Sequence, residues 1–209
     1  ALVWLSRPAP LAADRYTLYR GGDEIGQVGT LVGYGRPGTG ASGAPSTYTG
    51  EPIRQKANNL MEADTALLKR EYGSALGWTP LPGSQLVADF DNGQPQTDAL
   101  GLFLDIHDLG LGASEGVITP GDSGGPLLQL GAGGGPGSSR GSAHGSAPDV
   151  QLGISSFTHN ASVCLGEPAG FTNLAQLGPW IADTINDLTT GLWVGRGERC
   201  VAGQGRGRC

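Results

Sequence analysis

Residues 121–126, with the sequence Gly-Asp-Ser-Gly-Gly-Pro, carry the side chains of this chain that are best suited to chemistry. A serine hydroxyl is a weak nucleophile until a base takes its proton, and its attack on a carbonyl needs N–H donors aimed at the oxyanion that forms. Gly121 and Gly124 allow the backbone to turn tightly beside the serine with no Cβ in the way. We therefore interpret Ser123 as a nucleophile and expect the N–H groups of Gly121 and Ser123 to form an oxyanion hole.

Three histidines are candidate bases for this serine: His107, His144 and His159. The first has aspartates at 105 and 108 beside it, so the sequence alone allows an internal triad of Asp105 or Asp108, His107 and Ser123. The alternative is that His107 is a loop histidine near the entrance of the pocket. His144 lies in a Gly/Ser-rich loop and is expected to face solvent, whereas His159 follows an expected strand and is a candidate to line the cleft.

A second group of polar residues, Asp89, Asp91 and Asp98, lies in the segment 89–98 and has some features of a calcium loop. The EF-hand pattern needs a third ligand before its glycine and a glutamate at its twelfth position. Here the glycine comes one residue early and no glutamate follows. We therefore interpret the segment as an acidic surface turn, and we expect neither a metal ion nor a cofactor.

The composition favours a turn-rich all-β protein. Glycine contributes 38 and proline 14 of the 209 residues, while charged residues make up 15% and aromatic residues 6%. The formal net charge of -6 argues against nucleic acid as a partner. Because no apolar run approaches the roughly 20 residues that cross a bilayer, we expect no membrane span.

Turn signals divide the chain into short apolar or alternating runs, which predict strands over residues 1–5, 16–21, 29–35, 85–90, 99–106, 125–130 and 150–157. Residues 52–68 fit a strand, a turn or a short helix. The low-complexity segment 131–148 joins the last two strands into an elongated hairpin. Pro179 and the apolar spacing after it predict an amphipathic helix over 177–189, followed by a loose Gly/Arg-rich tail, 190–209.

The cysteines, Cys164, Cys200 and Cys209, are odd in number and do not define a disulfide framework or a compartment. Cys200 and Cys209 close a short loop and are candidates for a disulfide. Cys164 is then left over, or pairs with a cysteine of the tail. Residues 160–162 match a glycosylation sequon, which carries weight only in a eukaryotic secretory context.

Residues 121–126 are identical to the nucleophile motif of the trypsin-like serine proteases, and the flanking sequence agrees with that family. Residues 29–35, GTLVGYG, resemble the family's first strand of the second barrel, which usually ends Gly-aromatic-Gly. Residues 152–157, LGISSF, resemble its substrate-pairing strand. Residues 167–185 resemble its closing segment and C-terminal helix. The resemblance runs in register from residue 1 to about residue 188.

This resemblance implies an all-β, chymotrypsin-like double β-barrel, of which the chain holds the last strand of the first barrel, the second barrel and a C-terminal helix. Residues 1–189 would then be the C-terminal part of a protease domain. Within it, 1–20 would end the first barrel and form the linker, 21–176 would form the second barrel, and 177–189 the helix.

The resemblance also implies where the rest of the triad lies. In the family the triad aspartate is followed, after one apolar residue, by Ala-Leu, and this chain begins with Ala1 and Leu2. The aspartate would lie two residues before Ala1, and the histidine further upstream, in the missing N-terminal barrel of the same parent chain. An internal triad on His107 is therefore disfavoured, and the chain alone is expected to be inactive. The family uses the aspartate at the position of Asp122 to bind a new N-terminal amine.

Matched positions also predict a substrate pocket: Val117 at its floor, Ser156, Phe157 and Thr158 on one wall, and Ala169 on the other. Since Val117 is not acidic and glycine is absent at Thr158 and Ala169, we expect small apolar side chains such as Ala or Val to fit, rather than Arg or Lys. Thr119 stands where the family often has a cysteine that bridges to a position near Cys164.

Three functions stay open at this point. The first is a secreted serine endopeptidase acting on protein or peptide substrates. The second is a non-catalytic protease homologue that binds peptides or proteins. The third, a scaffold without chemistry, is disfavoured because residues 121–126 keep the nucleophile.

Overall fold

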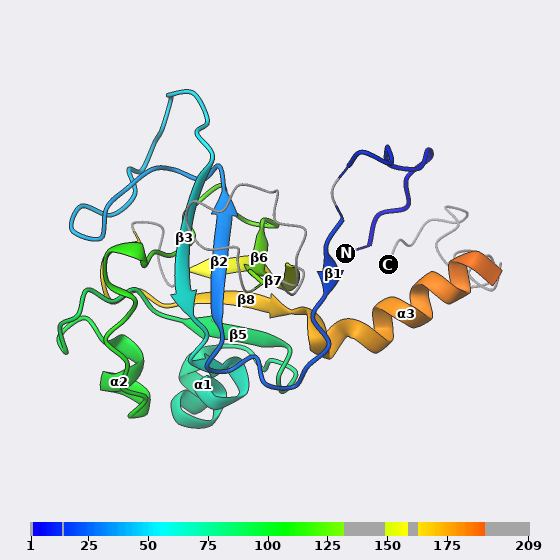
Figure 1. Cartoon of the computed structure of the whole chain (residues 1–209). Coiled ribbons are helices and arrows are strands. Elements are labelled where there is room, and N and C mark those ends of the chain that lie inside the picture. Colours follow the sequence, from blue (N-terminus) through cyan, green and yellow to red (C-terminus); the bar gives the residue numbers. More distant parts are fainter. Residues whose placement is uncertain (1, 14, 132–148, 159–162, 191–209) are drawn as a thin grey trace, which may run out of the picture. The chain divides into compact units, whose positions relative to one another are not determined.

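The computed structural model describes residues 2–13, 15–131, 149–158 and 163–190 (Figure 1). The chain divides into two compact units, one formed by residues 14–176 and the other by residues 1–13 with 177–209. The serine motif and all the predicted pocket residues belong to the first unit. No helix in the described part of the chain is long and apolar enough to cross a membrane.

The unit 14–176 is built on one mostly antiparallel sheet with the strand order β3-β2-β6-β7-β8-β5-β4. Its strands are β1 (Thr17–Leu18), β2 (Val28–Gly33), β3 (Gln55–Leu60), β4 (Ala63–Asp64), β5 (Gln85–Ala88), β6 (Pro126–Gln129), β7 (Val150–Thr158) and β8 (Ala169–Asn173). The short β1 pairs with β7 in parallel, off the main order. The antiparallel pairing of β6 with β7 confirms the predicted hairpin, whose connection, 132–148, lies outside the described residues.

The core of this sheet consists of buried side chains from several strands and from two connecting segments. Its buried members are Leu31, Met61, Leu86, Ala88, Ile118, Leu127, Leu152, Ala169 and Phe171. Leu127 and Leu152 come from paired neighbours, β6 and β7, while Ile118 comes from the loop that leads to Ser123. Burial of Ile118 therefore anchors that loop to the core.

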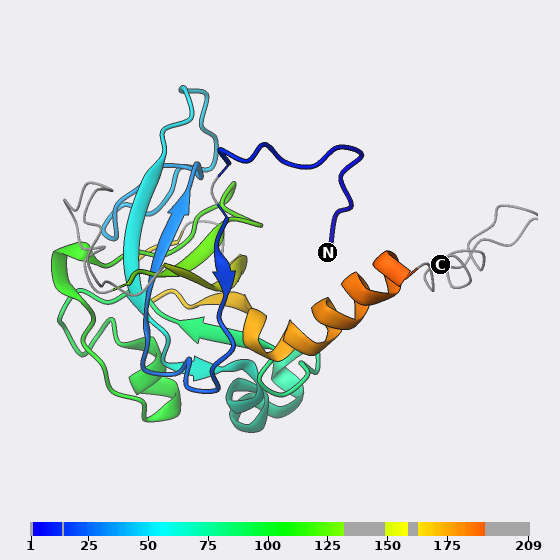
Figure 2. The ribbon, with the colours of Figure 1, turned by 45° about the vertical axis from the view of Figure 1, so that its right-hand side comes forward.

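Two helices, α1 (Thr65–Tyr72) and α2 (Ala99–Leu104), lie at the end of β2 and β3 that is opposite the long loop 36–54 (Figures 1 and 2). The helix α1 begins at an aspartate cap, because a side-chain oxygen of Asp64 accepts the N–H of Leu67 at 2.9 Å. The ambiguous segment 52–68 is thus a strand, a short strand and the start of a helix.

The predicted strand at 99–106 is wrong, because residues 99–104 form α2. Asp98 caps this helix through its Oδ1, which accepts the N–H of Gly101 at 2.5 Å, and Asp105 ends it in the left-handed region at φ 60°. The predicted strand at 1–5 is also wrong, since residues 2–5 have no strand structure. Both segments are apolar runs, and apolar runs alone do not separate strands from short helices.

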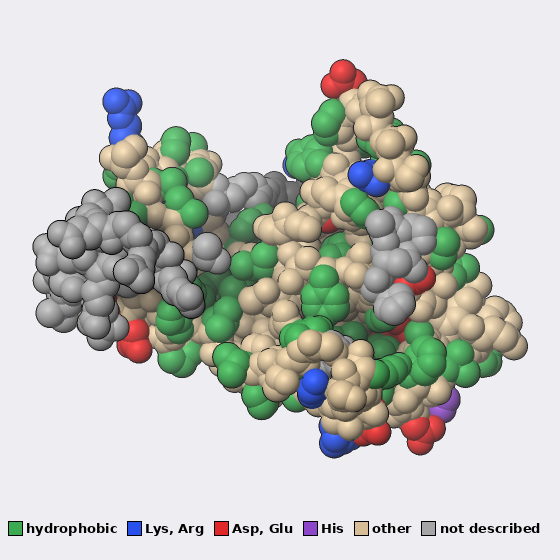
Figure 3. Space-filling model, turned by 180° about the vertical axis from the view of Figure 1, so that it is seen from behind, with side chains coloured by type: hydrophobic (Ala, Val, Ile, Leu, Met, Phe, Trp, Pro, Cys, Tyr) green, Lys and Arg blue, Asp and Glu red, His purple; other side chains and the backbone are tan. Residues whose placement is uncertain are grey.

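The terminal helix α3 spans Leu174–Thr190, so the expected helix is confirmed but starts earlier, with Pro179 inside it. Asn173 provides the reason: its Oδ1 accepts the N–H of Ala175 at 3.0 Å and satisfies a donor of the first turn. The surface in Figure 3 is a mixture of hydrophobic and uncharged polar side chains with few charges, as the composition of 15% charged residues requires.

Candidate active site

The backbone around Ser123 is a tight turn that only glycine fits easily. Gly121 has φ 108° and Gly124 has φ 85°, both in the region that L side chains rarely adopt. The turn is held to β7 by two hydrogen bonds, Gly124 N–H to Ser155 O and Ser155 N–H to Gly125 O, each 2.9 Å. The serine itself is exposed, so its hydroxyl is accessible to a substrate.

The expected oxyanion donors are compatible with this turn. Among the described residues, neither the N–H of Gly121 nor that of Ser123 donates a backbone hydrogen bond, whereas the N–H groups of Asp122, Gly124 and Gly125 all do. Two N–H groups beside the serine are therefore free of backbone acceptors. Their convergence on an oxyanion stays a prediction.

The carboxylate of Asp122 is held by donors from the chain itself. Its Oδ1 accepts the N–H of Gly35 at 2.7 Å, and its Oδ2 accepts the N–H of Thr119 at 2.9 Å. The hydroxyl of Thr119 lies 3.1 Å from the same Oδ2. Asp122 therefore connects the end of β2 to the loop before the serine, and Thr119 takes part in this connection.

The Gly-aromatic-Gly ending of residues 29–35 has its physical reason in this contact. A Cβ on Gly33 would lie 1.9 Å from Oδ1 of Asp122, and a Cβ on Gly35 would lie 2.4 Å from Oδ2. Neither distance leaves room for a side chain, so both glycines permit the close approach of the carboxylate. The glycines of the motif at 29–35 thus provide the space that the carboxylate of the motif at 121–126 occupies.

A cavity of about 170 Å³ adjoins this carboxylate. Its lining includes Gly33, Gly35, Val117, Thr119 and Asp122. Of the five predicted pocket residues, the lining contains Val117 alone. The cavity therefore lies on the side of the loop that carries Asp122, and it is not assembled from the predicted pocket walls.

The predicted walls themselves lie on the paired strands β7 and β8. Thr158 pairs with Ala169, and Phe157 pairs with Gly170. Phe157 covers that glycine closely, because a Cβ on Gly170 would lie 2.2 Å from its ring. Ala169 is fully buried, while Phe157 and Thr158 are half-buried like Ser156. The walls are adjacent, and their use as a substrate pocket stays a prediction.

His107 is an exposed histidine whose two ring nitrogens both contact carboxylates. Its Nδ1 lies 3.1 Å from Oδ2 of Asp98, and its Nε2 lies 3.1 Å from Oδ1 of Asp105. The hydrogen bond to Asp98, followed by that to Asp105, raises the pKa of this imidazole. Since both nitrogens are occupied away from the serine, these contacts give no support to an internal triad. His144 and His159 lie outside the described residues.

The interpretation of 89–98 as an acidic surface turn is wrong for its three aspartates. Asp89, Asp91 and Asp98 are 0%, 3% and 1% exposed. The residues between Asp91 and Asp98 do form an exposed or half-buried loop, but the carboxylates point inward. The acidic character of the segment is visible in the sequence. Whether its carboxylates face the solvent or the interior depends on how β5 packs.

Two residues that the sequence did not single out, Asn59 and Glu115, join this acidic loop to the segment before the serine. Asn59 is buried, and its Nδ2 donates to Asp89 O at 2.6 Å and to Gly116 O at 3.0 Å. Oε1 of Glu115 accepts the N–H of Asp91 at 2.6 Å, and burial raises the pKa of this carboxyl. The contacts that join the two segments are distant in the sequence, so no local signal could identify this role.

Cys164 is a half-buried free cysteine. The proposed pairing of Cys200 with Cys209 and the sequon at 160–162 lie outside the described residues.

The chain is similar to a solved structure described as neuropsin, a serine protease expressed in the limbic system of mouse brain. The TM-score is 0.52 at 15% sequence identity, and the match covers 86% of this chain and 58% of that one. This chain thus spans less than two thirds of the matched structure. No family model and no curated protein matches the sequence. At this identity the likeness shows the fold alone, which is a mostly antiparallel sheet similar to the chymotrypsin-like fold.

Proposed function

We propose that the chain is the serine-bearing part of the catalytic domain of a secreted, trypsin-like serine endopeptidase. The observation that carries the proposal is the turn at 121–126, in which an exposed serine follows a carboxylate that is hydrogen-bonded to Gly35 and Thr119. The protease-like fold supports the proposal.

The proposed reaction uses Ser123 as the nucleophile. Its Oγ attacks the carbonyl carbon of the scissile peptide bond while an imidazole takes the hydroxyl proton. The N–H groups of Gly121 and Ser123 stabilise the oxyanion. The same imidazole then gives its proton to the leaving amine, and water hydrolyses the acyl-enzyme on Ser123. In the proposal this histidine and its aspartate partner come from the parent protein upstream of Ala1.

Asp122 has a positioning role in this proposal. It touches neither the substrate nor the reacting atoms, but its carboxylate fixes the backbone that carries Ser123. In the trypsin-like family the equivalent carboxylate binds a new N-terminal amine. The 170 Å³ cavity beside Asp122 is a candidate place for such a group. The donors already present in this chain hold the carboxylate without it.

The proposed specificity is for small apolar side chains on the amino side of the scissile bond. Val117 provides no charge to pair with a basic side chain, and burying an unpaired ammonium or guanidinium costs several kcal/mol, so roughly 10²-fold or more in rate. A peptide library in which cleavage after Arg or Lys dominates contradicts this part of the proposal.

A second candidate function is a non-catalytic homologue that binds peptides. It is favoured by one observation: His107, the histidine that the structure describes, has both ring nitrogens bonded to carboxylates. A fluorophosphonate that labels activated serines separates the two functions.

The experiment uses the parent protein with its upstream sequence, beside residues 1–209 alone. We expect the parent to be labelled at Ser123 and to cleave small-side-chain substrates, and Ser123→Ala to lose both, with turnover falling about 10⁶-fold. Ser114→Ala, which alters another exposed serine, is the matched control and keeps both properties. Labelling that persists in Ser123→Ala rejects Ser123 as the nucleophile. A folded parent that neither labels nor cleaves rejects the endopeptidase in favour of the binding homologue.

A further inference from the structure

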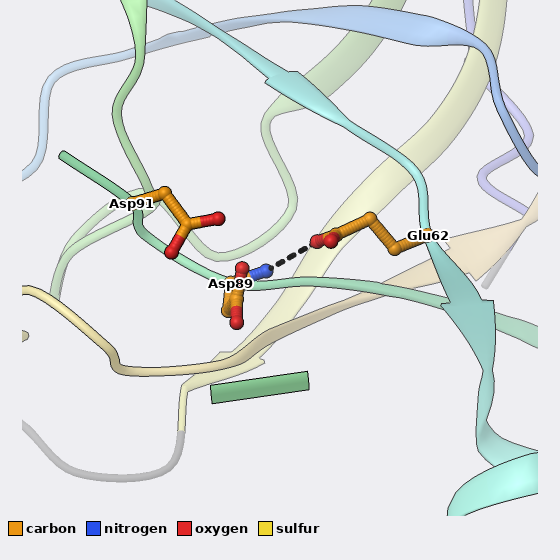
Figure 4. Close-up of side chains that lie close together, drawn as sticks. All are labelled: Glu62, Asp89 and Asp91. Carbon is orange, nitrogen blue, oxygen red and sulfur yellow. Dashed lines mark hydrogen bonds between the residues drawn. The ribbon is translucent and has the colours of Figure 1, made fainter. Parts of the chain in front are cut away.

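Three carboxylates from two separate segments meet in the interior of the unit 14–176 (Figure 4). Glu62 lies between β3 and β4, whereas Asp89 and Asp91 follow β5. Their exposed fractions are 7%, 0% and 3%. One oxygen from each residue lies within 4.8 Å of the others. Ionised carboxylates repel one another strongly at such separations away from water, so this arrangement requires a compensating group.

Among the residues that the structure describes, each of these three has a buried oxygen without a hydrogen-bond partner. These atoms are Oε1 of Glu62, Oδ1 of Asp89 and Oδ1 of Asp91. The other oxygens of two of the residues are bonded, since Oε2 of Glu62 accepts the N–H of Asp89 at 3.1 Å and Oδ2 of Asp89 accepts the N–H of Leu100 at 2.7 Å. Buried polar atoms are normally paired, so three orphan oxygens in one place indicate a missing ligand.

The described surroundings of this cluster contribute negative charge. Within the described residues, none of the three carboxylates forms a salt bridge with Lys, Arg or His. The nearest charged groups instead add to the negative charge. A cation would supply the counter-charge that the fold lacks.

We propose that Glu62, Asp89 and Asp91 bind a divalent cation, and that this cation is Ca²⁺. Carboxylate oxygens are the ligands of hard cations, and Ca²⁺–O distances of about 2.3–2.6 Å place opposite ligands roughly 5 Å apart, which accommodates the observed oxygens. Mg²⁺ usually keeps several of its waters, whereas these side chains are almost fully buried. A cation at this site would depart from the sequence-based expectation of no metal ion in the segment 89–98.

The site differs from an EF-hand because its ligands do not come from one loop. It joins the β3–β4 connection to the segment after β5, and Asn59 extends the connection by binding both Asp89 O and Gly116 O. Gly116 directly precedes Val117, on the segment that leads to Ser123. A bound Ca²⁺ would therefore stabilise the loop 89–116 and fix the chain that enters the serine turn.

The test uses the full chain of residues 1–209, stripped with EDTA and then dialysed. Calorimetric titration with CaCl₂, MgCl₂ and MnCl₂ measures stoichiometry and affinity. We expect one Ca²⁺ per chain and a melting temperature that rises by about 5–10 °C at a free Ca²⁺ concentration 100-fold above the Kd. We expect Asp89→Asn to weaken the binding of Ca²⁺ by roughly 100-fold or more, because loss of a ligand costs at least as much as loss of an outer-shell partner.

The matched control is Asp105→Asn, which removes an acid whose side chain is 96% exposed and should leave Ca²⁺ binding unchanged. If Asp89→Asn does not fold, Asp91→Asn takes its place, because Oδ1 of Asp91 has no partner to lose. Absence of binding heat and of a melting shift for all three metals overturns the site. So does an equal response of the ligand variant and the control. A response to Mg²⁺ or Mn²⁺ stronger than that to Ca²⁺ overturns the assignment to Ca²⁺.

Discussion

Asp122 and the cluster of Glu62, Asp89 and Asp91 show two ways of placing carboxylates inside one sheet protein. Asp122 stands alone, and its two oxygens accept N–H groups of Gly35 and Thr119. The cluster brings three carboxylates together, with one unpartnered buried oxygen on each. Asp122 lies beside a cavity, whereas the cluster is almost fully buried.

Asp122 is stabilised by hydrogen bonds from the chain itself, whereas the three acids of the cluster need a ligand. A carboxylate that accepts several N–H bonds is stabilised in its charged form without any other group. Buried carboxylates that face one another are not, and they must take up protons or a cation. Replacing a carboxylate by its amide should therefore lower the free energy of unfolding at Asp122 and raise it in the cluster.

The largest effect is expected at Asn59, which connects the two regions. Replacing it by the similarly shaped Leu leaves Asp89 O and Gly116 O without their donor inside the protein. Asn59→Leu should lower the free energy of unfolding by about 3 kcal/mol, measured by urea denaturation, because two buried carbonyls lose their partner. The control is Asn58→Leu, which removes a single half-buried bond from Thr30 and should cost about 1 kcal/mol. Equal losses in the two variants would show that Asn59 does not connect the regions.

The sequence predicted the sheet better than the segments around it. Strands such as β2 and β7 follow apolar runs bounded by turns, and their hairpin and core pattern could be read directly. No strand was predicted over β8, whose residues were matched only to the closing segment of the family. Residues 99–104 became a helix because Asp98 caps them and Asp105 accepts a left-handed conformation. Such local hydrogen bonds decide between helix and strand where apolar content alone does not.

The serine turn could be predicted because its chemistry is local: the glycines, Asp122 and Ser123 are contiguous in the chain. The acidic cluster could not, because Glu62 and Asp89 are separated by 27 residues and meet only when β3 and β5 fold into one sheet. A search for a calcium loop tests ligands within one segment. It therefore rejected this segment as an EF-hand, and it could not show that the aspartates are buried beside Glu62.

At Asp122 the expected effect is a loss of stability. Asp122→Asn keeps the shape but places an NH₂ group against one of two N–H donors, so that either Gly35 or Thr119 loses its acceptor. The free energy of unfolding should fall by about 2 kcal/mol. In the parent protein, labelling of Ser123 by a fluorophosphonate should slow as well. Asp105→Asn is the isosteric control, and an equally small change in both variants would refute a framework role for Asp122.

At Glu62 the same kind of change should increase stability. Gln keeps an oxygen for the N–H of Asp89 and adds an NH₂ group that can donate to the unpartnered oxygens of Asp89 or Asp91. In EDTA at pH 8, Glu62→Gln should raise the free energy of unfolding by about 1 kcal/mol. Glu51→Gln, on the exposed surface, is the control and should have no effect. A Glu62→Gln protein that is less stable than the unmodified chain in EDTA would remove the contrast between the two regions.

The smallest effect is expected at Asp98, an intermediate case in which a buried carboxylate is partnered by the exposed His107 at 3.1 Å. The hydrogen bonds to Asp98 and then Asp105 raise the pKa of His107 above its ordinary 6.5, so the folded protein holds this proton more tightly than the unfolded chain does. The resulting stabilisation is complete below pH 6.5 and is lost as the pH rises through the folded-state pKa. His107→Ala should therefore reduce the decline in melting temperature between pH 6 and pH 8.5, with the two curves converging at the alkaline end. Because water and salt screen an exposed imidazole, the difference should be small and should shrink further in 1 M NaCl. If the melting temperatures of the two proteins change with pH in parallel across this range, His107 does not stabilise the fold through Asp98. Asp98 would then resemble the other buried acids, which have no positively charged partner among the described residues.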